Sequence, residues 1–191
     1  ITAATGMLRP LCCALALAAA SPSAPAMDAG REDVRQFMEE MRRKHGSDEA
    51  WLAGVVAAAE PQPRIIELMT KPAEQAMTWG SYRGHFLSPD RIAAGLQFWV
   101  EHRDKLAETE RETGVAARTI VGILGVVTSY GRITGRYRVL DALTTLAFDY
   151  PPRAAYFRGE LEEFLLLARE NQIDTSAVLG CYAGAMGRAQ F

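Results

Sequence analysis

Cysteine and histidine are both scarce in this chain of 191 residues, which holds three of each. The histidines are scattered at positions 45, 85 and 102, and two of the cysteines lie near the N-terminus. A zinc site needs four such ligands brought together, and no spacing of these residues suggests one. We therefore expect no metal site and no cofactor.

An excess of basic charge is also lacking, since 21 Lys and Arg face 23 Asp and Glu for a formal net charge of −2. A nucleic-acid-binding domain normally shows a basic patch or a high pI, so this composition argues against one. Alternating valine–isoleucine strands and internal repeats are missing as well. With 49% apolar residues, the chain reads as one globular domain that is all-α.

The one long apolar run, Leu11 to Ala20, lies near the N-terminus and is too short to span a membrane. It follows the short basic start at Met7–Pro10 and precedes Ala24-Pro25-Ala26, whose small residues suit a cut before Met27. Residues 1–26 are therefore predicted to be upstream residues and a signal peptide, and 27–191 the exported, periplasmic domain.

The cysteines bear on this export prediction. A lipoprotein signal would place its cysteine at the end of the apolar run, whereas Cys12 and Cys13 stand at the start, so no stable membrane anchor is expected. Once the signal is removed, Cys181 is the only cysteine left and cannot form an intramolecular disulfide. The exported domain must then rely on its core alone.

The rest of the chain has the spacing of helices. Apolar residues recur every three or four positions, Gly46 and Gly114 are typical stop signals, and Ser88-Pro89-Asp90 is a strong helix start. The aromatic-rich stretch 73–87 has no clear period and is predicted to be a loop. Predicted helices cover 33–46, 50–59, one or two turns near 64–71, 88–113, 116–129, 136–150 and 152–172.

Two of these helices have well-defined inward faces. The first should bury Val34, Phe37, Met38 and Met41, and the last Phe157, Leu161, Phe164, Leu165 and Ala168. In the helix over 88–113, the residues predicted to lie on the apolar side are Ile92, Leu96, Phe98, Trp99 and Leu106.

Two further stretches stand out: a polar cluster that ends an apolar helix, and a run of small residues. "GILGVVTSYGRITG" (122–135) ends in Thr128, Ser129 and Tyr130, and "GCYAGAMGRAQF" (180–191) repeats glycine and alanine. Small residues allow close backbone packing or let an extended ligand lie against the main chain. By itself the run is more often packing than a site.

Together these stretches resemble the MltB-like lytic transglycosylases of bacterial cell walls. "YAGAMGRAQF" is similar to the family's Y/F-A-G-A-M-G-x-x-Q-F, and "GVVTSYGRITGRYRVLDALTTLAFDYPPRAAYF" to its G-V-E-T motif with the segment that follows. "SYRGHFLSPDRIAAGLQFW" and "FLLLARE" fit too, so the resemblance covers about residues 76–191. It implies a lysozyme-like helical fold whose C-terminal part is missing here.

The resemblance also implies a reaction, cleavage of the MurNAc-β-1,4-GlcNAc bond with formation of 1,6-anhydroMurNAc. One glutamate protonates the leaving oxygen and then takes the proton of the 6-hydroxyl, without a second carboxylate. In G-V-E-T this glutamate is the third residue, and here that position is Val127. Valine carries no proton to give, so this chain is predicted to be inactive.

Other positions matched to the family are expected to bind substrate, in this case the glycan strands of peptidoglycan. Tyr82, Tyr130, Gln190 and Phe191 would lie along the glycan, while Arg153 would meet a lactyl or peptide carboxylate. Two of these residues have an equally open structural interpretation, which is helix packing for Tyr130 and a surface ion pair for Arg153. Cys181 replaces a serine of the family, and a thiol is the poorer hydrogen-bonding group.

Three hypotheses follow. The chain is a truncated copy of a lytic transglycosylase that lacks its acid/base, or a pseudoenzyme that binds peptidoglycan glycan without cutting it. The third hypothesis is a helical periplasmic scaffold that has lost sugar binding as well. The first two differ only at Val127, and a chain that binds no glycan would leave the third.

Overall fold

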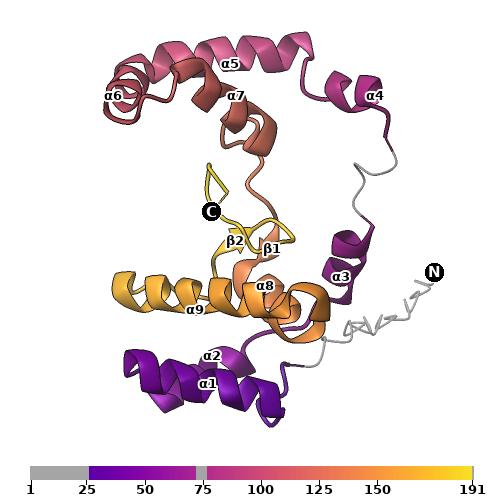
Figure 1. The fold of residues 1–191 in the computed structure, drawn as a ribbon, viewed down its shortest axis with the longest axis vertical. Coiled ribbons are helices and arrows are strands. Elements are labelled where there is room, and N and C mark those ends of the chain that lie inside the picture. Colours follow the sequence, from indigo (N-terminus) through magenta and orange to yellow (C-terminus); the bar gives the residue numbers. More distant parts are fainter. Residues whose placement is uncertain (1–25, 72–76, 191) are drawn as a thin grey trace, which may run out of the picture.

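The computed structural model describes residues 26–71 and 77–190, and these fold into two helical lobes joined by extended segments (Figure 1). The lower lobe contains α1 (Glu32–His45), α2 (Glu49–Ala57), α3 (Pro63–Thr70), α8 (Val139–Asp149), the 3-10 turn η2 (Pro151–Arg153) and α9 (Ala154–Asn171). The upper lobe contains α4 (Trp79–Gly84), α5 (Pro89–Glu101), α6 (Arg103–Thr113) and α7 (Ala117–Thr128). In sequence the upper lobe is inserted between α3 and α8.

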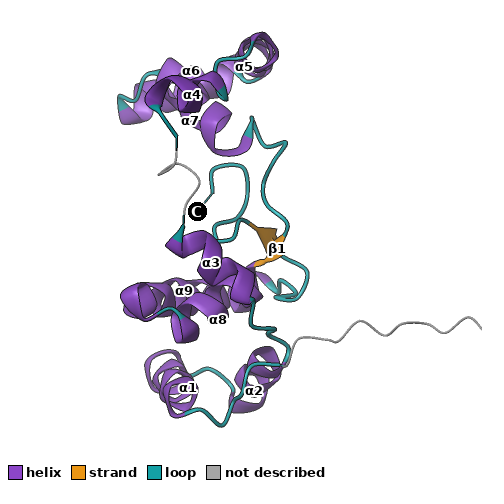
Figure 2. Cartoon of the chain, turned by 90° about the vertical axis from the view of Figure 1, so that its right-hand side faces the viewer, coloured by secondary structure: helices purple, strands orange, loops and turns teal. Residues whose placement is uncertain are grey.

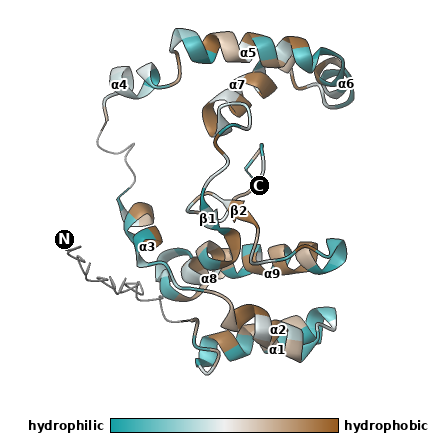
Figure 3. Ribbon diagram, turned by 180° about the vertical axis from the view of Figure 1, so that it is seen from behind, coloured by the Kyte–Doolittle hydropathy of each residue, from teal (hydrophilic) through white to brown (hydrophobic). Residues whose placement is uncertain are grey.

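The core of the lower lobe is built around α8, whose residues from Val139 to Phe148 are all buried. Helix α8 packs against α1, α3 and α9 (Figure 3), so that even its polar residues Asp141, Thr144 and Thr145 are buried. The inward face predicted for 152–172 is confirmed, since Phe157, Leu161, Phe164, Leu165 and Ala168 are all buried. In α1, Val34, Phe37 and Met41 are buried and Met38 is partly so.

The upper lobe has a smaller core of its own, made by Phe98, Leu106, Ala117 and Val121 where α5, α6 and α7 meet. Sequence spacing predicts one helix over 88–113, and this is wrong. The backbone leaves the helical region at His102, with φ −111° and ψ 18°, so α5 ends at Glu101 and α6 begins at Arg103. The bend lets Phe98 and Leu106 reach the same small core.

A second correction concerns the apolar side of this segment. Phe98 and Leu106 are buried as predicted, but Ile92, Leu96 and Trp99 lie on the exposed side of α5. The stretch 73–87 is also not wholly a loop, because α4 forms within it. Thr78 caps that helix by accepting a hydrogen bond from the Ser81 amide.

A two-stranded antiparallel ribbon lies between the lobes (Figure 2), formed by β1 (Tyr137–Arg138) and β2 (Leu179–Gly180). The all-α prediction therefore holds except for this short pairing. Of the two interpretations of the glycine run, close backbone packing is seen here, because a Cβ on Gly135 would lie 1.9 Å from the Gly180 carbonyl oxygen. A Cβ on Gly180 would in turn lie 2.4 Å from the Ala185 oxygen.

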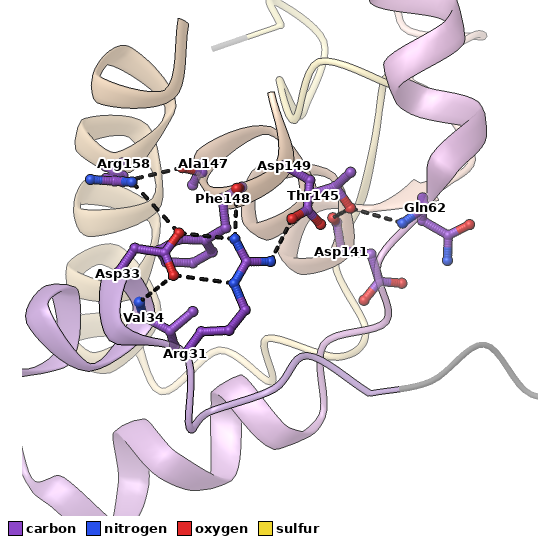
Figure 4. Close-up of polar contacts among 10 residues, drawn as sticks. All are labelled: Arg31, Asp33, Val34, Gln62, Asp141, Thr145, Ala147, Phe148, Asp149 and Arg158. Atoms are coloured by element: carbon purple, nitrogen blue, oxygen red, sulfur yellow. Dashed lines mark hydrogen bonds and ion pairs between the residues drawn. The ribbon is translucent and has the colours of Figure 1, made fainter. Parts of the chain in front are cut away.

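Polar groups, most of them partly buried, connect the start of α1 and the segment after α2 to α8 (Figure 4). Arg31 pairs with Asp33 and Asp149, and its guanidinium also donates to the Phe148 carbonyl at 2.8 Å. Asp141 accepts from the Glu60 amide at 2.9 Å, and burial raises the pKa of this carboxyl. The helical ends of α8 thereby hold the start of α1 and the segment after α2.

The predicted signal peptide and nearly all of residues 1–26 lie outside the described residues. Within the described part of the chain, no helix combines the length and the apolar character needed to cross a bilayer.

Candidate functional site

The end of α7 carries the position singled out by the sequence, and a tight left-handed turn follows it. Ser129, Tyr130 and Gly131 have φ angles of 50°, 64° and 87° in succession. The Tyr130 amide donates back to the Leu124 carbonyl at 3.0 Å, which closes the turn on the last helical residues. Helix α7 therefore stops at Thr128.

Thr128 links this turn to the C-terminal segment. Its side chain is fully buried, and its hydroxyl donates to the Arg188 carbonyl at 2.7 Å while accepting from the Gly131 amide at 2.9 Å. The hydroxyl thus joins two parts of the chain that are far apart in sequence. The end of α7 and the run 180–190 form one structural unit.

Val127 lies one residue before this anchor, and it is 43% exposed. The exposed side of α7 also carries Ile123 and Val126, so the surface at this helix end is apolar. No Asp or Glu occurs between Glu112 and Asp141, and Asp141 is buried in the lower lobe. The end of α7 and its turn consequently offer no carboxyl group that could act as acid or base.

Tyr130 lies in the packing between α5 and α7. Its ring stacks with Phe98 at 5.6 Å between centroids, and its hydroxyl donates to the Arg91 carbonyl at 3.3 Å. A Cβ on Gly95 or Gly125 would lie 2.5 Å from the tyrosine oxygen, so the two glycines make room for the ring. Of the two interpretations left open for Tyr130, this position favours helix packing.

Arg153 and Gln190 line a cavity of about 620 Å³ between α9 and the segment 183–190. The Arg153 guanidinium lies over the Tyr156 ring, 4.3 Å from its centroid. Among the described residues no carboxylate lies within ion-pair distance of Arg153, so the predicted surface ion pair is not formed. The cation is ordered by an aromatic ring and remains available to an anion.

Gln190 closes the C-terminal turn. Its side-chain amide donates to the Thr134 carbonyl at 3.1 Å and to the Gly187 carbonyl at 2.9 Å. Cys181 starts a separate turn over 181–184 and is a half-buried free thiol, whose sulfur accepts from the Ala183 amide at 3.4 Å. Gln190 lines the cavity, whereas Cys181 lies outside its lining and holds the neighbouring backbone.

The remaining predicted residues are placed elsewhere. Tyr82 lies on α4, where its ring packs against Trp79 and Phe86 with centroids 6.1 and 5.0 Å apart. This aromatic group is at the end of the upper lobe, beyond the start of α5 (Figure 1). Phe191 lies outside the described residues. Within the described residues, no group of three His, Cys, Asp or Glu side chains could hold a metal ion.

Two acids that line the cavity, Glu160 and Glu163, are not predicted as site residues from the sequence. The charged residues around Glu163 have the pattern of a solvent-exposed helix face. Both lie on the wall that α9 provides, on the same side as Arg153 and Tyr156. Positions 153, 156, 160 and 163 are three or four residues apart, so they lie on one face of the helix. This spacing is the feature of the sequence that could have indicated a shared polar face.

Comparisons with known proteins agree on one family. A model of the transglycosylase SLT domain matches residues 29–191. Membrane-bound lytic murein transglycosylase B of Escherichia coli K12 is 40% identical over 172 residues, which are 85% of this chain and 48% of that protein.

Two solved structures extend the similarity to the fold. Soluble lytic transglycosylase SltB1 of Pseudomonas aeruginosa is 49% identical, with a TM-score of 0.76 over 82% of this chain and 52% of its own. Escherichia coli lytic transglycosylase Slt35, solved in complex with bulgecin A, is 40% identical, with a TM-score of 0.81 over 88% of this chain and 55% of its own. The chain spans about half the length of these relatives.

Proposed function

Because the chain belongs to the transglycosylase SLT domain family, we propose that it is a peptidoglycan lytic transglycosylase domain whose acid/base position is occupied by Val127. The reaction of such an enzyme cleaves the MurNAc-β-1,4-GlcNAc bond and leaves a 1,6-anhydroMurNAc end. The observation that carries the proposal is the exposed position of Val127 at the end of α7, directly before the anchored turn. A side chain at this point is fixed by the turn and accessible to a ligand.

The chain as it stands is expected to be inactive. The single carboxyl of this mechanism acts twice, first as an acid toward the leaving oxygen and then as a base toward the 6-hydroxyl. Each proton transfer by a positioned group is worth roughly 10²–10⁴-fold in rate. Valine supplies neither, and the hydroxyls of Thr128, Ser129 and Tyr130 are too weakly acidic to replace a carboxylic acid.

Glycan binding is the function that the remaining residues support. Arg153 makes no ion pair with Glu160 or Glu163, which line the same cavity, so its guanidinium can meet the lactyl or peptide carboxylate of peptidoglycan. Gln190 would form part of the wall along which the glycan lies, and Cys181 would hold the turn beside that wall. Tyr82 and Phe191 would add aromatic surface. The retained cavity favours a glycan-binding pseudoenzyme as the second candidate function over a scaffold without sugar binding.

Binding is tested by mixing the chain with purified peptidoglycan sacculi and measuring the fraction that sediments with them. The Arg153→Ala variant should sediment severalfold less than the parent chain. Arg118→Ala, which removes an exposed arginine at the start of α7, is the matched control and should behave as the parent does. Equal sedimentation of the two variants would reject the role of Arg153, and no sedimentation of any form would leave the scaffold.

Catalysis is tested by placing Val127→Glu in this chain after joining it to the unmatched remainder of the E. coli relative. The products of digested sacculi are separated and identified by mass spectrometry. The glutamate form should release 1,6-anhydro muropeptides and the valine form should not. A glutamate form that binds sacculi but releases no such product would contradict the assignment of position 127.

Export through the segment 7–26 completes the proposal. The E. coli relative is described as membrane-bound, whereas in this chain Cys12 and Cys13 stand at the start of the apolar run. We therefore propose a cleaved, unanchored periplasmic domain. The mass of the protein isolated from a periplasmic extract would show whether the mature chain starts at Met27, and a lipid-modified cysteine in that mass would contradict it.

A further inference from the structure

Helix α9 carries charged side chains on two sides, and the side that faces α1 is neutralised by that helix. Glu162 shares a hydrogen bond with His45, with 2.6 Å between the carboxylate oxygen and the ring nitrogen. Arg158 lies 3.8 Å from the Asp33 carboxylate on the same side (Figure 4). These charges hold α9 against α1.

The charges on the cavity side of α9 have no such partners. Arg153, Glu160 and Glu163 line the cavity of about 620 Å³, and all three are exposed. Within residues 26–71 and 77–190, none of these three side chains forms an ion pair or a hydrogen bond. The Arg153 guanidinium lies over the rings of Tyr156 and Phe157, 4.3 and 5.0 Å from their centroids. One cation and two anions therefore face the cavity with their charges available to a ligand.

The two signs of charge are separated along the helix. Arg153 stands at the N-terminal end of α9, and Glu160 and Glu163 follow about two and three turns later on the same face. At 1.5 Å per residue, the backbone positions of the two acids lie about 10 and 15 Å from that of the arginine. A ligand that meets both ends must carry a negative and a positive group at a distance from each other. A single anion would satisfy the arginine alone.

The rest of the lining is largely apolar. Leu143 of α8 and Phe157 and Phe164 of α9 are buried beneath the cavity. The wall across from α9 is the segment 183–186, which lies close to α8, because a Cβ on Gly184 would be 2.3 Å from Leu143. Such a lining suits the methylene groups of an aliphatic chain better than the hydroxyl groups of a sugar.

We propose that this cavity binds a peptide that ends in a diamino acid. Arg153 holds the terminal carboxylate, Glu160 and Glu163 hold the side-chain ammonium, and the methylene chain lies on the apolar lining. In lysine the two charged groups are separated by the α-carbon and four methylene groups. The long arginine and glutamate side chains close the remaining distance.

Peptidoglycan is a source of such a ligand, because its glycan strands carry short peptides that contain a diamino acid. For this source the inference rests on the proposed function, and it names the peptide as the part of the polymer that enters the cavity. A free peptide of the same chemistry would bind in the same way. The experiment therefore uses soluble peptides first and the polymer second.

The test is an NMR titration of the isotope-labelled 191-residue chain at low salt. The probe is acetyl-Ala-Ala-Lys, whose charges are the terminal carboxylate and the side-chain ammonium. Two matched peptides each lack one charge, since one has an acetylated lysine side chain and the other a C-terminal amide. The backbone amide signals of 183–186 should move on binding. The affinity for the probe should exceed that for either matched peptide about two- to fivefold, which is the contribution of an exposed ion pair.

Protein variants assign each charge of the peptide to its partner. Glu160→Gln combined with Glu163→Gln should bind the probe as weakly as the parent chain binds the acetylated peptide, and should bind the acetylated peptide unchanged. Arg153→Gln should show the same relation to the amidated peptide. The control is Glu170→Gln, at an exposed acid of α9 outside the cavity, and it should leave all three affinities unchanged. A merely structural defect would weaken the three peptides alike.

Three results would overturn the inference: no binding of the probe, equal affinity for the three peptides, or variants that discriminate among them as the parent chain does. Sedimentation with sacculi separates this outcome from that of the proposed function. If the chain sediments with sacculi but does not discriminate among the peptides, the inference fails and the proposed function stands. If it discriminates but does not sediment, the proposed function fails and the cavity is a site for free peptides.

Discussion

Two glycines of α7 should respond in opposite directions to the same substitution. Gly122 is exposed, and a Cβ added there meets no atom within 4 Å. Gly125, one turn further, is buried, and its added Cβ would lie 2.5 Å from the Tyr130 oxygen and 2.8 Å from the ring carbon that bears it. Alanine is therefore accommodated at the first position and collides with a ring at the second.

The magnitudes follow from helix propensity and packing. Alanine is favoured over glycine inside a helix by about 1 kcal/mol, so Gly122→Ala should stabilise the fold by up to that amount. Gly125→Ala gains the same propensity but forces the Tyr130 ring away from Phe98, and overpacking of a core costs about 1–3 kcal/mol. The two variants should then differ by about 1–3 kcal/mol, with Gly125→Ala the less stable.

Urea unfolding followed by circular dichroism measures both free energies. Removal of the ring by Tyr130→Ala supplies a further check, because it should cost less in the Gly125→Ala background than in the parent chain. If Gly125→Ala proves as stable as Gly122→Ala, the ring of Tyr130 does not lie between the two helices, and the interpretation of this residue as packing is wrong.

Three other outcomes are expected. Thr128→Val keeps the shape of the side chain but removes a buried hydroxyl with two backbone partners. It should lower the free energy of unfolding by about 1–3 kcal/mol and speed amide exchange at Gly131. Thr128→Ser keeps the hydroxyl and should leave both the stability and the exchange rate close to those of the parent chain. Arg31→Leu leaves Asp149 without its cation and should lower the urea midpoint by an amount equivalent to about 1.5–3 kcal/mol, with an unchanged slope. A hydrogen bond to the α1 histidine lowers the pKa of Glu162 below its ordinary 4.5, so its contribution to stability is present above that pH and is lost as the pH falls through the folded-state pKa. The melting temperature should accordingly fall less steeply between about pH 6 and pH 3 for Glu162→Gln than for the parent chain.

Much of the lower lobe could be predicted from local pattern. In α9 the inward residues repeat at helical spacing against a charged outer side, so the sequence alone assigns Phe157 to Ala168 to the core. The helix start at Ser88 is equally readable, since a hydroxyl cap, a proline and an acid occur in order. These features depend on neighbours along the chain.

The errors arise where distant parts of the chain decide the outcome. The apolar period continues from α5 into α6, and only the shared core of Phe98 and Leu106 requires the bend at His102. Ile92, Leu96 and Trp99 read as a core face because periodicity reports that one side of a helix is apolar but not whether other elements cover it. A short helix such as α4 has too few residues to show a period at all.

The candidate site is predictable only in part, and mainly through resemblance. Position 127 is identified by its motif, and the structure shows it at an exposed helix end. The cavity beside Arg153 could not be assembled from the sequence, because it needs α9 to lie against the segment 183–190. Tyr130 is ambiguous in the sequence for the same reason, since its environment is made by two glycines on different helices, Gly95 and Gly125.

The insertion of the upper lobe between α3 and α8 has a consequence for how the chain folds. α3 and α8 pack together, yet the segment from 71 to 138 must first be looped out for them to meet. The entropy of closing a loop grows only with the logarithm of its length, so replacing roughly 70 residues by 10 saves only about 2 kcal/mol. Looping out the upper lobe therefore takes little from the stability that the packing of α3 on α8 provides.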